Sequence, residues 1–121
     1  MRNYHDLNVW KKAHELTIEI YKTTESFPSK EQYSLTSQMC RASYSIPMNI
    51  AEGCGKSTDA ELARFLDMSA GSASELDYQL LLARDLGYFN AASYQSLSEK
   101  LNHIRRMLTS LIKHTRTRSR G

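Results

Sequence analysis

The sequence predicts an all-α protein: an up-down-up-down antiparallel four-helix bundle with a kinked second helix. Apolar residues recur at steps of three and four along four segments, and no β-like alternation of useful length interrupts them. The 121 residues include only five glycines and two prolines, so turns are few and helices long. This length suits one domain. We expect the bundle in residues 1–114 and a flexible basic tail in residues 115–121.

The first helix is expected from about Leu7 to Thr24, where Trp10, Ala13 and Ile20 fall at helical spacing. The stretch "SFPSKEQYSL" interrupts it, because Pro28 ends the helix. Ser29 and Gln32 then have the spacing of a capping box for the next helix.

The second helix is expected over residues 30–52, and Pro47 lies inside it. A proline removes one backbone hydrogen bond and clashes with the preceding turn, so a kink is expected there. Two shorter helices are the alternative. The buried stripe of this segment is Leu35, Met39, Ala42, Ile46 and Ile50.

The stretch "AEGCGKST", residues 51–58, superficially resembles a phosphate-binding loop. That motif needs a glycine five residues before Gly55, and Ile50 occupies the position. The preceding segment is also helical in pattern, whereas a phosphate-binding loop follows a strand. We therefore interpret Gly53 as a glycine at a helix C-terminus, free to adopt positive φ. Thr58 and Glu61 then cap the next helix.

The third helix is expected over residues 59–86, ending at Gly87, and the fourth over residues 91–114, capped by Asn90. Small residues in "SAGSAS", positions 69–74, would allow a neighbouring helix backbone to approach closely. A flexible hinge is the alternative interpretation of that stretch. The fourth helix carries the most regular heptad seam in the chain: Tyr94, Leu97, Leu101, Ile104, Leu108 and Leu111.

Charge is unevenly distributed along the chain. Residues 101–121 contain six basic and no acidic side chains, so the first 100 residues carry 10 basic and 13 acidic groups, a net of −3. The chain thus has a basic end with a charge of +6 on a mildly acidic body. This asymmetry is informative about binding partners and does not indicate a fold. The basic residues are Arg105, Arg106, Lys113, Arg116, Arg118 and Arg120.

Three stretches carry a family resemblance: "DLNVWKKAHEL", "FPSKEQYSLTSQMCRASYSIPMNIAEG" and "FLDMSAGSASELDYQLLLARDLGY". They resemble, in the same order, the bacterial four-helix-bundle proteins encoded in intervening sequences of 23S ribosomal RNA genes, also labelled S23-type ribosomal proteins. The resemblance spans about residues 4–90, and the fourth helix matches only in pattern.

This resemblance implies a small helical bundle that assembles as a homopentameric ring and has no established enzyme activity. The family is related to accessory proteins of diversity-generating retroelements, which bind nucleic acid and a reverse transcriptase. Six aromatic residues are more than a thin bundle core hides, so some are expected at subunit contacts. They are Tyr4, Trp10, Tyr33, Tyr44, Phe89 and Tyr94.

Catalytic and metal-binding patterns are missing from the sequence. The four histidines are scattered without an H-x-x-x-H pair, and Cys40 and Cys54 have no C-x-x-C spacing. We expect no enzyme activity, no metal and no cofactor. Two cysteines, no signal-peptide pattern and no run of 18 apolar residues predict a reduced, cytoplasmic protein with no membrane segment.

Three hypotheses account for the basic end. In the first, its six basic residues bind RNA or DNA through backbone phosphates, and a ring of copies multiplies the effect. In the second, the bundle is a protein-interaction scaffold, such as the partner of a reverse transcriptase, and the tail pairs with a neighbouring subunit's acidic third helix. That helix offers Asp67, Glu75, Asp77 and Asp85. In the third, the cations only complement the helix dipole.

Overall fold

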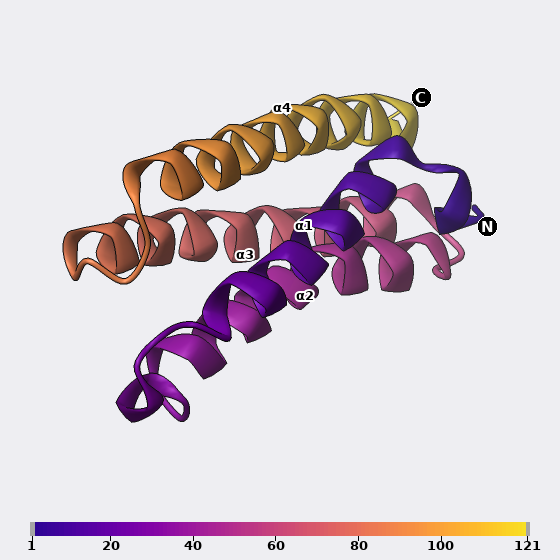
Figure 1. Ribbon diagram of the computed structural model, residues 1–121. Helices are drawn as coiled ribbons and strands as arrows, with labels where there is room; N and C mark the ends of the chain where they lie inside the picture. The colour runs from indigo at the N-terminus through magenta and orange to yellow at the C-terminus, as the bar shows by residue number, and fades with distance from the viewer. Residues whose placement is uncertain (1, 121) are drawn as a thin grey trace.

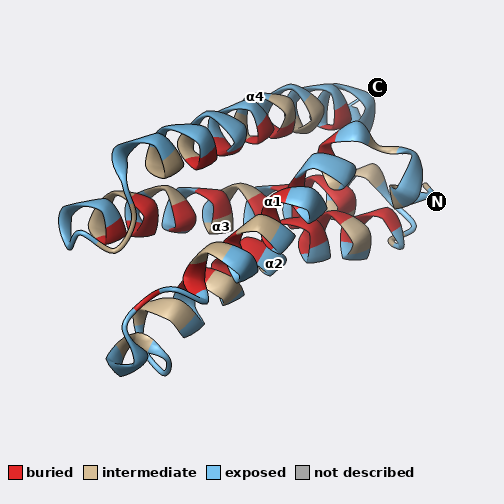
Figure 2. Ribbon diagram, viewed as in Figure 1, coloured by how far each residue is buried: buried red, intermediate tan, exposed pale blue. Residues whose placement is uncertain are grey.

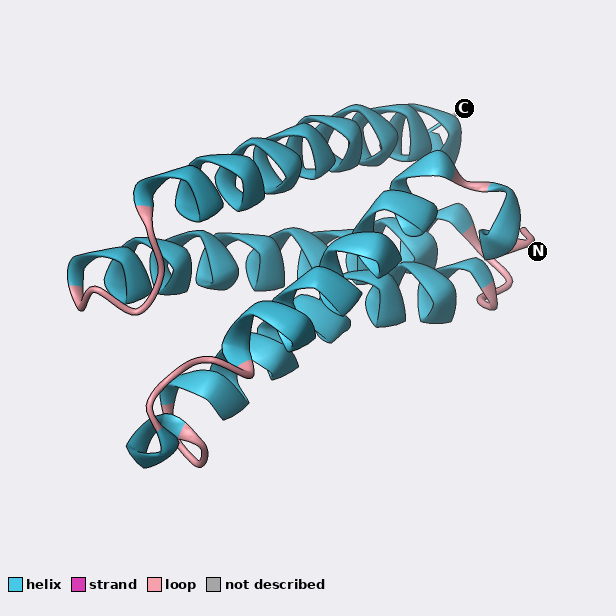
Figure 3. Cartoon of the chain, viewed as in Figure 1, coloured by secondary structure: helices cyan, strands magenta, loops and turns pink. Residues whose placement is uncertain are grey.

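The computed structural model describes residues 2–120 and confirms the all-α four-helix bundle (Figure 1). Two short 3₁₀ turns, Tyr4–Asp6 and Ser29–Glu31, precede the first and second helices. The four helices are α1 (Asn8–Thr24), α2 (Leu35–Cys54), α3 (Asp59–Asp85) and α4 (Ala91–Arg120). Helices account for most of the described chain, and Figure 3 shows loops joining them.

Successive helices run antiparallel, so both termini lie at the same end of the bundle (Figure 1). Each helix packs against its two neighbours around the bundle; the α2–α3 contact is the most extensive and the α1–α4 contact the least. In Figure 1 the α1–α2 pair crosses the α3–α4 pair at an angle. At the end opposite the termini, Phe27 of the α1–α2 connection packs against Tyr88 and Phe89 of the α3–α4 connection.

The core is formed by the apolar stripes that the sequence pattern predicts. Figure 2 shows that the buried residues of all four helices turn toward the bundle interior. At about 25 cal/mol per Å² of apolar surface, this burial is the main source of stability. The largest fully buried apolar side chains are Leu16, Ile20, Met39, Ile46, Ile50, Leu66, Leu76, Leu80, Leu101, Ile104 and Leu108.

Pro47 lies inside a single continuous helix, so the alternative of two shorter helices is wrong. Because proline has no N–H, the carbonyl of Ser43 loses its usual intrahelical donor. The hydroxyl of Thr17 on α1 donates to that carbonyl instead, at 3.0 Å and in a buried position. The α3 hydroxyl of Ser69 donates to the nearby Ile46 carbonyl at 2.9 Å. Neighbouring helices thus complete the hydrogen bonding around the proline.

Gly53 has a different role from the one expected. It lies within α2 with ordinary negative φ, and Gly87 is the only described residue with positive φ, at 76°. A Cβ on Gly53 would lie 2.9 Å from Leu62 Cδ1 and 3.0 Å from Phe65 Cβ. The glycine is therefore required because α2 and α3 approach closely here. The prediction that small residues in α3 serve packing agrees with buried Ser69 and Ala73.

The helix caps follow the sequence in part. Thr58 Oγ1 accepts from the Glu61 amide at 3.1 Å, and Asn90 Oδ1 accepts from the Ser93 amide at 2.8 Å, as predicted. The predicted Ser29 cap is wrong, because α2 begins at Leu35 rather than near residue 30. The carboxylate of Glu31 accepts hydrogen bonds there from the Ser34 hydroxyl and, at 3.4 Å, from the Leu35 amide.

The fourth helix extends further than the sequence suggested. The heptad seam led to an expected end at His114, followed by a flexible tail, but α4 continues to Arg120. Thr115 is fully buried and continues the seam one step beyond Leu111. The helix therefore runs past the boundary expected at residue 115 as far as Arg120, and Gly121 lies outside the described residues.

Candidate nucleic-acid interface

The structure divides the six predicted binding residues into two groups of three. One group faces α3 and forms ion pairs with it. Arg105 lies 3.5 Å from Asp77 and also donates to the Ser74 hydroxyl at 3.3 Å. Further along α4, Arg116 pairs with Asp67, and Arg118 lies 3.4 Å from Asp59.

These pairs join α4 to α3 within one subunit. Each pair is partly exposed, so each stabilises the bundle only slightly, by about 0.2–1 kcal/mol. Their main consequence is electrostatic: three of the six cations face a carboxylate. Asp67 and Asp77 were expected as candidates for pairing between subunits, and they instead bind arginines of their own chain.

The other group consists of Arg106, Lys113 and Arg120, which take part in no ion pair among residues 2–120. All three are exposed and seven residues apart, so they fall on one side of α4. At 1.5 Å per residue the row is about 21 Å long. We call these three residues the basic row. Among the six predicted residues, they are the three that pair with no carboxylate of residues 2–120.

A hollow of about 540 Å³ lies beside the basic row, between α4 and the start of α1. Arg106 lines it together with His103 and His114, while Met107 and Leu111 provide apolar surface. Sequence reasoning treated these histidines as scattered. Their spacing of three and eight residues around Arg106 was the available signal, since it places all three on adjoining sides of one helix.

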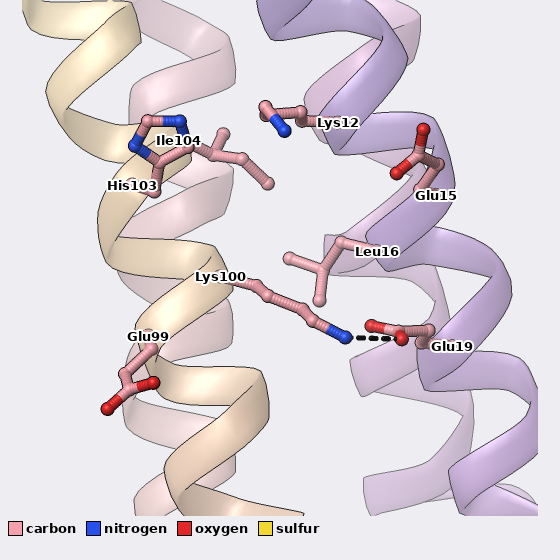
Figure 4. Close-up of a pocket in the computed structure, with 8 residues that line it drawn as sticks. All are labelled: Lys12, Glu15, Leu16, Glu19, Glu99, Lys100, His103 and Ile104. Carbon is pink, nitrogen blue, oxygen red and sulfur yellow. Dashed lines mark hydrogen bonds and ion pairs between the residues drawn. The ribbon is translucent and has the colours of Figure 1, made fainter.

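A second hollow lies between α1 and α4, where the bundle contact is smallest (Figure 4). It has a volume of about 490 Å³, and Leu16 and Ile104 are among its lining residues. Lys100 on α4 donates to Glu19 on α1 at 2.6 Å across this gap, as the dashed line in Figure 4 shows. Lys12, Glu15, Glu99 and His103 complete the lining. This mixture of charges makes the hollow less suited to an anion than the basic row.

The aromatic residues expected at subunit contacts divide into two sets. Trp10 is partly buried, and its ring is stacked between those of His5 and His14, at centroid distances of 5.2 and 5.1 Å. Tyr4, Phe89 and Tyr94 also pack against the core. Two remain open on the surface: Tyr33, which is 90% exposed, and Tyr44, which is 39% exposed.

No catalytic constellation is evident in the described residues. Cys40 and Cys54 are free thiols, and burial raises the pKa of the Cys54 thiol, which disfavours its nucleophilic thiolate form. Within residues 2–120 no three His, Cys, Asp or Glu side chains are arranged to hold a metal ion. None of the four helices combines the length and apolar character that a bilayer crossing requires.

Comparison with known proteins identifies the family. Residues 5–110 match the family described as 23S rRNA-intervening sequence protein. A crystal structure of a protein with unknown function from the S23 ribosomal protein family of Bacteroides thetaiotaomicron superposes with a TM-score of 0.80 and 24% identity, covering 87% of this chain and 95% of that one. Among curated proteins, none is similar enough to match. The chain therefore belongs to the 23S rRNA-intervening sequence protein family, whose matched crystal structure shares its helical fold.

Proposed function

We propose that this protein is a non-catalytic, ring-forming bundle that binds RNA or DNA through the phosphate backbone. The observation that carries the proposal is the basic row on α4, in which Arg106, Lys113 and Arg120 are exposed and form no ion pair among residues 2–120. Phosphate contacts of this kind position a protein on nucleic acid without selecting a sequence.

The magnitude of binding follows from the number of unneutralised cations. Three phosphate contacts per chain give a salt slope of about −2.7 on duplex DNA, since each contributes about −0.9. If five copies form the ring that the family resemblance implies, the basic rows together present 15 cations, five times three. Such repetition converts weak single contacts into avid binding.

The other three arginines are proposed to act indirectly. Arg105, Arg116 and Arg118 hold α4 against α3 through Asp77, Asp67 and Asp59. A phosphate that approached them would compete with a carboxylate already in place. We therefore assign the primary contacts to the basic row and a supporting role to the paired arginines.

Two triple variants of equal charge test this assignment. The first replaces the basic row with glutamine at positions 106, 113 and 120, and the matched control replaces Arg105, Arg116 and Arg118 in the same way. Structured RNA and duplex DNA are titrated against each protein at low and near-physiological salt. We expect the first variant to lose most of the salt slope and the control to retain most of it.

Three other results would count against the proposal. If the wild-type chain binds neither ligand at low salt, nucleic-acid binding is wrong. If both variants lose the slope equally, overall charge matters and the basic row has no special role. If only the control loses it, the paired arginines are the phosphate contacts. Circular dichroism of each variant confirms that the helices are intact before binding is compared.

A second candidate function is a scaffold for another protein, such as a retroelement reverse transcriptase. The observation in its favour is that all eight exposed large apolar side chains of the described residues lie on α1, α2, α3 or the adjoining loops, and none on α4. Genomic position separates the two candidates. A neighbouring reverse-transcriptase gene with a template repeat favours the scaffold, whereas a site within a 23S rRNA gene favours the intervening-sequence branch.

A further inference from the structure

Gln79 on α3 is the starting point, because its side chain carries an unsatisfied polar atom. The residue is only 8% exposed, and its Oε1 atom is buried without a hydrogen-bond donor among residues 2–120. A buried acceptor without a donor is destabilising by about 1–3 kcal/mol. Such atoms are rare in folded proteins, so each calls for an explanation, and an absent partner is one.

The surroundings of Gln79 are those of a docking surface. It lines a hollow of about 650 Å³ between the start of α2 and the second half of α3. Tyr78 and Leu86 in the same hollow are 61% and 49% exposed. Glu75 is an exposed carboxylate there with no ion pair among residues 2–120. We call this the acceptor hollow: it is apolar at its edges, offers acceptors, and contains no cation.

A second surface has the opposite character. A hollow of about 550 Å³ between α1 and α2 is lined by Tyr21 and Tyr44, which are 47% and 39% exposed. Arg41 projects from α2 beside them, exposed and without an ion pair among the described residues; Glu25 is the one carboxylate in this lining. Arginine flanked by tyrosines is the composition of energetically dominant interface sites. We call this the donor hollow.

We propose that the donor hollow of one copy docks into the acceptor hollow of the next, with the Arg41 guanidinium donating to Gln79 Oε1 and to Glu75. The inference rests on the proposed ring and identifies its subunit contact. Arg41 supplies the donor that Gln79 lacks and the cation that Glu75 lacks. Tyrosine side chains on both surfaces and leucine side chains of the acceptor hollow become buried around that pair.

The location of the two hollows also fixes the type of assembly. They are different surfaces, so a contact between them is head-to-tail rather than two-fold symmetric. The acceptor hollow lies between α2 and α3, and the donor hollow lies between α1 and α2. These are adjacent sides of the bundle, and Tyr33 borders both. Each subunit therefore turns relative to the previous one, and a head-to-tail contact with such a turn forms a ring when successive rotations close.

A charge exchange tests the contact directly. Arg41→Glu and Glu75→Arg each place like charges together, and the double variant restores an opposite pair. Sedimentation velocity over a range of protein concentrations measures assembly. We expect each single variant to weaken assembly by about tenfold or more and the double variant to recover most of that loss. Lys22→Glu, an exposed charge reversal on α1 outside both hollows, is the matched control and should assemble as the wild type does.

Gln79→Leu provides a second measurement. In an isolated subunit the change removes an unsatisfied atom, so the monomer should not lose stability, yet assembly should weaken because Arg41 loses an acceptor. A wild-type chain that remains monomeric at every concentration refutes the ring, and this contact with it. A wild-type ring that both single charge variants form equally well refutes this contact alone. Nucleic acid is titrated against the same samples as an independent measurement. It shows whether the proposed binding function holds when the subunit contact does not.

Discussion

Thr17→Val tests the hydrogen bond that replaces the one lost at Pro47. The Thr17 hydroxyl donates to the Ser43 carbonyl, which has no donor in its own helix because residue 47 has no N–H. Valine has nearly the same shape and branches at the same carbon, so packing and helix preference change little. The main effect is a buried carbonyl left without a donor.

The expected loss in unfolding free energy is about 1–3 kcal/mol, the range for an unsatisfied buried group. Thr17 also donates to the Ala13 carbonyl at 2.9 Å, but that carbonyl keeps the backbone N–H of residue 17 as a donor. Thr24→Val is the matched control. It removes a similarly buried hydroxyl whose oxygen acceptors, the carbonyls of Ile20 and Tyr21, both belong to α1 itself. Its loss should be clearly smaller.

A double-mutant cycle with Pro47→Ala makes the reasoning specific. Alanine restores an N–H at position 47, which can donate to the Ser43 carbonyl in the ordinary helical register. In that background Thr17→Val should be less destabilising, with a coupling of about 1 kcal/mol. Urea unfolding followed by circular dichroism, at two protein concentrations, measures all four proteins. Equal losses in the two backgrounds would show that the Thr17 hydroxyl does not compensate for the proline.

Three further predictions concern the bundle itself. Gly53→Ala should destabilise the fold by about 1–2 kcal/mol, because the added Cβ clashes with α3. Gly71→Ala should stabilise the fold by about 0.5–1 kcal/mol, because a Cβ there meets no described atom within 4 Å. Equal shifts of the two variants in urea midpoint would contradict the packing argument. Thr115→Val should leave stability unchanged or raise it, because the buried hydroxyl has no hydrogen-bond partner in the described part of the chain, and a drop in melting temperature would reveal a bond to it. Hydrogen bonds from Ser34 and Tyr88 lower the pKa of Glu31, so their stabilisation is present above the usual carboxyl pKa and lost as pH falls through the folded value. The hydrogen bond between Tyr88 and Glu31 raises the pKa of Tyr88, so the stabilisation by this bond is also lost as pH rises through the folded pKa of Tyr88. The difference in unfolding free energy between wild type and Tyr88→Phe should therefore narrow at both low and high pH. A difference that does not change with pH would argue against the bond.

Much of the fold could be predicted from the sequence because helical periodicity records which side of each helix is buried. Leu97 to Leu108 lie on the predicted seam of α4 and are buried in the structure. The Thr58 and Asn90 caps were also predictable, since an N-cap depends on residues only three positions apart. Local chemistry therefore determined these features before tertiary contacts were known.

Features that depend on another helix were not predictable in the same way. Gly53 was assigned to a helix end, because nothing in its neighbourhood reveals that Leu62 and Phe65 will lie against it. The continuation of α4 beyond His114 depends on Thr115 packing into the core and on Asp67 and Asp59 reaching its arginines. Taken alone, the alternation of Arg with Thr and Ser in the last residues is typical of a flexible tail. Only the fold shows that acids of α3 lie beside these arginines.

The same limit applies to the candidate interface. The sequence identified all six cations but could not separate Arg106, Lys113 and Arg120 from the three that face α3. Spacing alone indicates which residues share a side of α4, and it does not show where the acids of α3 lie. Gln79 gave no signal at all, since an unsatisfied atom exists only relative to a folded environment.

The short connections between helices have a kinetic consequence. Each of the three loops joins two helices that pack directly against each other, so most native contacts form between segments close in sequence. Chains with such local topology fold on the microsecond to millisecond scale. The α1–α4 contact is the exception, because it joins the first and last helices and is also the smallest. We therefore expect consecutive helices to pair first and the α1–α4 contact to form last. The apolar sides of α1 and α4 are then exposed only briefly before any assembly begins.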